Sequence, residues 1–75
     1  SYTKSDFQKA LGKGDVTYVK VAQNREVPTG SLRIKLKDGT QQYLYASDVN
    51  EMQNLMDDEK FDNYTLEDVP AEAGS

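Results

Sequence analysis

The clearest pattern of hydrophobic and polar positions lies in the middle of the chain. Three aliphatic residues alternate there with three basic ones in Leu32-Arg33-Ile34-Lys35-Leu36-Lys37, which predicts a strand buried on one face. Asp38-Gly39 follows, and this dipeptide is typical of a two-residue hairpin turn. Pairing outward from that turn sets Leu36 opposite Gln41, Ile34 opposite Tyr43, and Leu32 opposite Tyr45. The hydrophobic side chains then share one face, so we expect both tyrosines in the core.

A short amphipathic helix is predicted over residues 3–12. Thr3 suits the N-cap position, with Asp6 three residues later as in a capping box. Phe7, Ala10 and Leu11 form a hydrophobic stripe with helical spacing. The glycines that follow, at 12 and 14, favour a left-handed cap at the C-terminal end.

A second helix is predicted to begin at Asp48, with Glu51 at its capping-box position. Its hydrophobic stripe consists of Val49, Met52, Leu55 and Met56. Asp57, Asp58 and Glu59 fall in its last turn, where negative charge opposes the helix dipole. We therefore expect this end to fray or to be held by a positive group.

Two further strands complete the prediction. β-branched residues over 15–22 predict one, in which the spacing of Val16 from Val19 and Val21 changes parity. A β-bulge, or packing of Val16 under the first helix, accounts for this change. Residues 63–69 predict a final edge strand that Pro70 terminates. The fold class is then α+β, in the order α-β-β-β-α-β: a small antiparallel-rich sheet of about four strands with two helices packed on one face.

These elements define one domain over residues 2–69, followed by a linker or tail over 70–75. No apolar run approaches the ~18–20 residues that a spanning helix needs, and no signal-peptide pattern is present. Because the first residue is Ser1 rather than Met, we expect a domain cut from a larger protein.

Composition removes most kinds of active site. The chain contains no Cys and no His, which removes the usual zinc ligands, His-based triads and the commonest general base at neutral pH. Ser–Lys, paired-carboxylate and all-oxygen metal sites stay open in principle, but nothing in the sequence fixes two acids across a cleft. We therefore expect no catalytic, cofactor-binding or metal-binding residue in this chain.

Charge is distributed unevenly around the net value of −4. Residues 1–47 hold eight Lys/Arg against four Asp/Glu, whereas 48–75 hold one against nine. Two solvated faces are the simplest interpretation. The alternative is that the acidic side of one subunit meets the basic side of another, as in a head-to-tail ring. Asp57, Asp58 and Glu59 are the candidate residues for such an oligomer surface, and the acidic balance disfavours nucleic acid as a partner.

A second candidate contact surface is the polar loop predicted over 23–30, which carries Asn24, Arg25 and Glu26. Connecting loops host binding more often than strands do, although a tolerated insertion explains this loop more simply. Tyrosines among basic strand residues also suggest a sheet on which bases stack. That interpretation needs Tyr43 and Tyr45 on the surface, and the predicted register buries both.

The order and spacing of several motifs resemble one known family. The run from Tyr2 through Ser5, Phe7, Leu11, Gly14, Val16, Val19 and Val21 is similar to the start of the extracytoplasmic domain of FtsH-type proteases. Leu36-Lys37-Asp38-Gly39-Thr40 resembles the central hairpin turn of that domain, and Tyr45-Ala46-Ser47-Asp48 resembles the segment before its second helix. The likeness covers the chain from about Tyr2 to Val69. Ser47 replaces a proline of the family pattern, and the loop 23–30 is longer than usual.

The resemblance implies a function for the parent protein. FtsH-type proteins are membrane-anchored, ATP-dependent hexameric zinc metalloproteases, in which this domain lies between two transmembrane helices. It faces the extracytoplasmic side of a bacterial membrane, or the mitochondrial equivalent. Zinc and ATP would belong to the parent alone, and this domain would contribute to self-assembly and to contacts with membrane-embedded regulators or substrates. A free-standing interaction or adaptor domain, with no protease attached, is the alternative.

Overall fold

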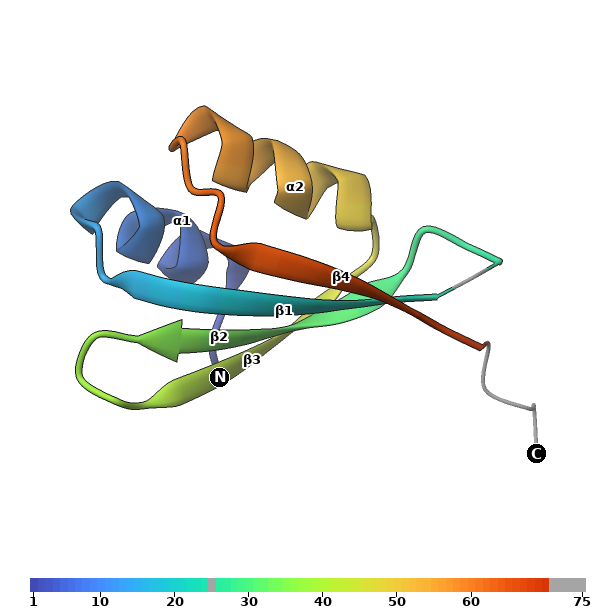
Figure 1. Ribbon diagram of the computed structural model, residues 1–75, viewed down its shortest axis with the longest axis horizontal. Coiled ribbons are helices and arrows are strands. Elements are labelled where there is room, and N and C mark those ends of the chain that lie inside the picture. Colours follow the sequence, from blue (N-terminus) through green and yellow to red (C-terminus); the bar gives the residue numbers. More distant parts are fainter. Residues whose placement is uncertain (25, 71–75) are drawn as a thin grey trace.

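The chain folds as an α+β sandwich of one sheet and two helices, in the predicted order α-β-β-β-α-β (Figure 1). The computed structural model describes residues 1–24 and 26–70. Its elements are α1 (Lys4–Lys13), β1 (Val16–Asn24), β2 (Gly30–Leu36), β3 (Gln41–Ala46), α2 (Val49–Asp58) and β4 (Tyr64–Val69). The strand order is β3-β2-β1-β4. All neighbours are antiparallel except β1 and β4, which run parallel.

Helix α1 has the capping that its sequence predicts. The Thr3 hydroxyl accepts a hydrogen bond from the Asp6 backbone N–H at 3.1 Å, and the Asp6 carboxylate accepts one from the Thr3 N–H at 2.9 Å. This reciprocal capping box satisfies two N–H groups that have no partner within the helix. Gly14 ends the helix in the left-handed conformation. The predicted start and end of this helix are therefore confirmed to within one residue.

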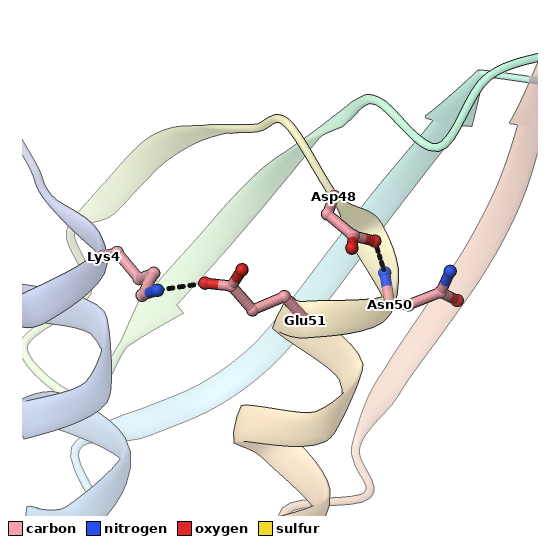
Figure 2. A network of polar contacts seen from close by, with 4 residues as sticks. All are labelled: Lys4, Asp48, Asn50 and Glu51. Atoms are coloured by element: carbon pink, nitrogen blue, oxygen red, sulfur yellow. Dashed lines mark hydrogen bonds and ion pairs between the residues drawn. The ribbon is translucent and has the colours of Figure 1, made fainter.

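Helix α2 is capped differently from the prediction. Asp48 is the N-cap, and its carboxylate accepts a hydrogen bond from the Asn50 N–H at 2.9 Å. Glu51 does not reach back to close a capping box. Its carboxylate instead forms an ion pair with the Lys4 ammonium on α1 (Figure 2). The nearby lysine competes with the helix backbone for this carboxylate, and no sequence pattern reveals a partner 47 residues away.

The acidic end of α2 is held by backbone geometry. Lys60 adopts the left-handed conformation, with φ of 56°. The Lys60 N–H then donates to the carbonyl of Asp57 at 2.9 Å, and the Phe61 N–H donates to that of Met56 at 2.8 Å. These two bonds are the Schellman arrangement, which satisfies carbonyls that the helix leaves without partners.

Strand β1 contains the predicted β-bulge, because its register against β2 shifts between Val16 and Tyr18. The strand also continues to Asn24, and β2 begins at Gly30. The loop predicted over 23–30 is therefore too long: only residues 25–29 connect the two strands. The polar residues Gln23 and Asn24 suggested a loop. In the structure they extend β1, because hydrogen bonding to β2 and β4 keeps their backbone extended.

The hairpin of β2 and β3 corrects the predicted register. The Leu36 N–H donates to Thr40 O at 2.9 Å, so the turn has three residues, 37–39, instead of two. Gly39 adopts φ of 88°, the left-handed position that a three-residue hairpin loop requires. Ile34 therefore pairs with Gln42 and Leu32 with Leu44. This shift by one residue turns every side chain of β3 to the opposite face.

The core lies between the helices and the covered face of the sheet. It consists of buried side chains from five elements: Phe7, Leu11, Val16, Val19, Val21, Leu32, Ile34, Leu44, Ala46, Val49, Met52 and Met56. Leu44 takes the place opposite Leu32 that the predicted register gave to Tyr45, and Gln42 takes the place opposite Ile34 that it gave to Tyr43. Tyr43 and Tyr45 are 63% and 70% exposed. The prediction that these tyrosines belong to the core is therefore wrong.

Candidate functional site

The uncovered face of the sheet is the surface on which we place the candidate site. Both helices lie on the other face, and nothing in the described chain covers this one (Figure 1). We call it the open face. Alternation along the strands brings thirteen side chains to it: Tyr18, Lys20, Ala22 and Asn24 of β1; Ser31, Arg33 and Lys35 of β2; Gln41, Tyr43 and Tyr45 of β3; and Thr65, Glu67 and Val69 of β4.

Basic side chains of the open face lie against its tyrosine rings. The Arg33 guanidinium is 5.5 Å from the centroid of the Tyr43 ring. The Lys35 ammonium is 5.7 Å from the centroid of the Tyr18 ring. Both distances fall within the range of cation–π attraction. These contacts hold two aromatic rings beside fixed positive charges.

Two polar contacts orient the rest of this surface. The Tyr18 hydroxyl lies 2.5 Å from Thr65 Oγ1, which ties β1 to the edge strand β4. Lys20 forms an ion pair with Glu67 at 3.1 Å between Nζ and Oε2. Among the described residues, Arg33 and Lys35 have no carboxylate partner. Their charges therefore remain available to an anionic group.

Two shallow hollows adjoin each other on the open face. The first has a volume of about 140 Å³ and is lined by Lys20, Ala22, Ser31, Arg33, Tyr43 and Glu67. The second, of about 230 Å³, is lined mainly by Ala22, Gly30, Tyr45, Val69 and Pro70. Ala22 and Ser31 border both hollows. One hollow is charged and the other is largely apolar, so together they suit a ligand with both kinds of group.

The sequence-predicted contact residues do not come together at one site. Asn24 ends β1, and its side-chain oxygen accepts a hydrogen bond from the Glu26 N–H at 3.1 Å, so this part of the loop forms a local turn. Arg25 lies outside the described residues. The acids Asp57, Asp58 and Glu59 are exposed at the C-terminal end of α2. Figure 1 places this end of α2 and the loop residues 26–29 at opposite ends of the sheet.

The shifted pKa values belong to structural contacts. Hydrogen bonds from the backbone and hydroxyl of Thr3 lower the pKa of Asp6, and those from Thr40 lower the pKa of Asp38. Burial, with a smaller contribution from the charge of Asp6, raises the pKa of the Tyr2 hydroxyl. Two of these groups serve a helix cap and a hairpin turn, and the third packs against the core.

Within residues 1–24 and 26–70, no three acidic side chains gather into a group that could hold a metal ion. No helix in this part of the chain is long and apolar enough to cross a membrane. The groups that the open face presents are the basic side chains and tyrosine rings described above, which can contact a ligand through charge and aromatic surface. Sequence reasoning missed this face because it placed Tyr43 and Tyr45 on the wrong side of the sheet.

Comparison with known proteins adds no assignment. No protein-family model matches the chain, and no curated protein matches it.

Proposed function

We propose that this chain is a non-catalytic extracytoplasmic domain of an FtsH-like, ATP-dependent, membrane-bound zinc metalloprotease. Its role is to contribute to assembly of the hexameric parent and to contacts with regulators or membrane-protein substrates. Proteolysis, zinc and ATP belong to other parts of the parent, because the motif His-Glu-x-x-His cannot occur in a chain without histidine.

One observation supports the proposal: several of the residues that resemble the family are buried in the core or cap an element of this fold. Phe7 and Leu11 anchor α1 in the core, and Gly14 caps it. Val19 and Val21 are fully buried at the centre of the sheet. This part of the resemblance therefore lies at buried and capping residues, which a shared architecture would require, while its other positions, such as Ser5, Asp38 and Tyr45, are exposed.

The alternative is a free-standing interaction domain, and the open face favours it equally. A surface with exposed tyrosines, unpaired cations and two hollows fits a protein-binding role with or without an attached protease. Both candidates give this chain a role in contacts with other proteins. They differ in what the rest of the gene encodes.

The full reading frame tests the choice between them. The leading proposal expects an apolar segment of about 20 residues on each side of residues 1–75, followed by an ATPase module and His-Glu-x-x-His. A reading frame that starts and stops near these ends, or one that encodes no ATPase, would overturn it. The adaptor alternative would then be retained.

Purified full-length protein provides the biochemical test. We expect ATP-dependent degradation of an unfolded substrate such as casein, inhibited by a zinc chelator. Deletion of residues 2–69 should leave the active-site motifs in place and lower the fraction of hexamer measured by light scattering. Unchanged hexamer formation in the deletion variant would contradict the assembly role.

A further inference from the structure

The open face combines several groups suited to recognition on a surface that none of the residues 1–24 and 26–70 covers. It gathers three tyrosines, three cations and one carboxylate on four strands, with two adjoining hollows. Tyr45 is 70% exposed. Tyrosine and arginine side chains are enriched at the energetic centre of protein interfaces.

Charge identifies the chemistry of the partner. In the charged hollow, Glu67 is already paired with Lys20, whereas Arg33 has no carboxylate partner among the described residues. Arg33 also lies over the Tyr43 ring, and this cation–π contact favours one position of its guanidinium. A planar guanidinium held in this way is suited to a carboxylate with two oxygens. An incoming Asp or Glu side chain satisfies it.

The second hollow selects an apolar group. Apolar atoms form most of its surface. Its lining consists of Ala22, Gly30, Tyr45, Val69 and Pro70, together with the polar residues Asn24, Thr29 and Ser31. A phenyl or branched aliphatic side chain placed there removes apolar surface from water on both partners. The ligand therefore combines a carboxylate with an apolar side chain.

The spacing between the hollows matches an extended peptide. The positions Lys20, Arg33 and Tyr43 form one row across the strands, and Ala22, Ser31 and Tyr45 form the next row on the same face. Because the rows are two residues apart along each strand, they are separated by about 6.7 Å. Side chains i and i+2 of an extended peptide have the same separation. A peptide lying along the strands can therefore fill both hollows at once.

We propose that the open face binds an extended acidic peptide segment of another protein, in which Asp or Glu lies two residues from a large apolar residue. The carboxylate contacts Arg33, and the apolar side chain occupies the hollow under Tyr45. This inference names a partner for the contact role proposed above and rests on that role only in expecting a protein ligand. Nucleic acid fits less well, because its row of phosphates would bring many negative charges to a face that also holds Glu67, on a chain of net charge −4, whereas the peptide brings one carboxylate to Arg33.

The test uses the whole 75-residue chain, isotope-labelled, and an NMR titration in low-salt buffer. The probe is the peptide Gly-Ser-Gly-Glu-Ser-Phe-Gly-Ser-Gly. We expect a Kd of about 1 mM or tighter, with chemical-shift changes centred on Ser31, Arg33, Tyr43 and Tyr45. A scrambled peptide with Glu and Phe adjacent directs the two side chains to opposite sides and should bind at least ~3-fold more weakly.

Substitutions in the two hollows separate the contribution of Arg33 to peptide binding from that of Tyr45. Arg33→Glu should weaken binding about tenfold, because it reverses the charge that meets the carboxylate. Lys9→Glu makes the same charge change on exposed α1, away from the open face, and should alter the Kd less than twofold. Tyr45→Ser should remove the preference for Phe over Ser in the probe, and thermal melting confirms that each variant is folded.

Several outcomes would overturn the proposal. These are absence of shift changes at millimolar peptide, equal binding of the scrambled peptide, or equal losses in Arg33→Glu and Lys9→Glu. Tighter binding of an oligothymidylate of similar length would assign the face to single-stranded nucleic acid instead. Concentration-dependent shifts of the open face without peptide would assign it to a second copy of the chain. None of these outcomes bears on the flanking gene sequence, so the proposed parent is tested separately.

Discussion

Lys60 is the residue whose backbone differs most from its intrinsic preference. Among the described residues it alone, apart from glycine, has a positive φ. Its left-handed conformation completes the Schellman motif after the acidic last turn of α2. The β-carbon of an L-residue is crowded in this conformation, at a cost of about 1–2 kcal/mol. The conformation of Lys60 therefore lowers the free energy of unfolding of the domain.

Replacing Lys60 by glycine should stabilise the domain. Glycine removes the crowding but has more freedom in the unfolded chain, so we expect a net gain of about 0.5–1 kcal/mol in the free energy of unfolding. Urea unfolding measures this gain. Lys60→Ala is the matched control, because it removes the charge and keeps the β-carbon. An equal gain in both variants would trace the effect to charge instead of backbone conformation.

The cap of α1 predicts a dependence of stability on pH. Hydrogen bonds from Thr3 place the folded pKa of Asp6 below its ordinary value of 3.8. A carboxyl group with a depressed folded pKa contributes stability above its unfolded pKa and loses it as pH falls through the folded pKa. Asp6→Asn should therefore destabilise the domain at pH 6, and this difference should shrink as pH falls below 3.8.

Thermal unfolding of both proteins between pH 2 and pH 7 measures this difference. Asp6→Asn leaves an amide oxygen that can still accept from the Thr3 N–H, so the comparison isolates the charge. A difference in melting temperature between wild type and Asp6→Asn that stays constant down to pH 2 would contradict the assigned role of the carboxylate.

At the scale of elements, the turn of the β2–β3 hairpin decides which residues face the core. Asp38 accepts hydrogen bonds from the backbone and hydroxyl of Thr40 at 2.9 and 2.6 Å, and Gly39 takes the left-handed position. These contacts favour a three-residue loop over the two-residue turn that Asp-Gly suggested. Leu44 becomes 8% exposed as a result, whereas Tyr43 and Tyr45 face solvent.

Truncating both sides of β3 tests this register. Leu44→Ala should cost about 2–4 kcal/mol, because it removes buried methyl groups and leaves a cavity. Tyr45→Ala should cost under about 1 kcal/mol, since its ring is mostly in solvent. Urea unfolding compares the two. The reverse order of these losses would restore the register in which the tyrosines form the core.

The loop 25–29 is joined to α2 by a close backbone contact. The Val49 N–H donates to the Pro28 carbonyl at 2.7 Å, which satisfies one free donor at the start of the helix. A β-carbon at position 30 would lie 2.3 Å from the Ala22 carbonyl oxygen and 2.8 Å from Val49 Cγ2. Glycine at position 30 therefore allows the strand, the loop and the helix to meet.

Gly30→Ala should destabilise the domain by about 1–3 kcal/mol, because the backbone of β1 must shift to admit the methyl group. Chemical denaturation measures the loss. Gly12→Ala is a suitable control, since a β-carbon there meets nothing closer than the Glu59 carboxylate at 3.9 Å. Similar stability of Gly30→Ala and wild type would show that the strands adjust at little cost.

At the scale of the whole molecule, the structure distributes the charges over three surfaces. Lys4, Lys9 and Lys13 belong to α1, whereas the cations of the strands lie on the open face: Lys20, Arg33 and Lys35. The acids Asp57, Asp58 and Glu59 end α2, on the helix-covered side. A head-to-tail contact between the acidic end of α2 and the lysines of α1 of another copy would leave the open face free.

Such a contact predicts weak, salt-sensitive self-association. Sedimentation velocity should show larger species at high protein concentration in low salt, and a monomer in high salt, because screening weakens attraction between exposed charges. Neutralising all three acids, with Asp57→Asn, Asp58→Asn and Glu59→Gln, should abolish it. A strict monomer at high concentration in low salt would argue against a ring formed by this domain alone.

Local sequence determined the helices, their caps at Thr3, Gly14 and Asp48, the bulge in β1 and the order of the elements. Each of these depends on residues within a few positions of one another, so periodicity and capping chemistry reveal them. The charge segregation and the lack of Cys and His are likewise properties of the sequence.

Only the tertiary structure decided the face of β3 and the partner of Glu51. Both registers of the hairpin bury hydrophobic side chains, so alternation alone could not choose between Tyr43 with Tyr45 and Leu44 with Ala46. The contacts of the three-residue turn lie within residues 36–40, but Asp-Gly is compatible with either turn. The space beneath the helices, which accepts Leu44 and Ala46, depends on contacts between distant segments and agrees with the three-residue turn. That choice created the open face, on which the proposed peptide site depends.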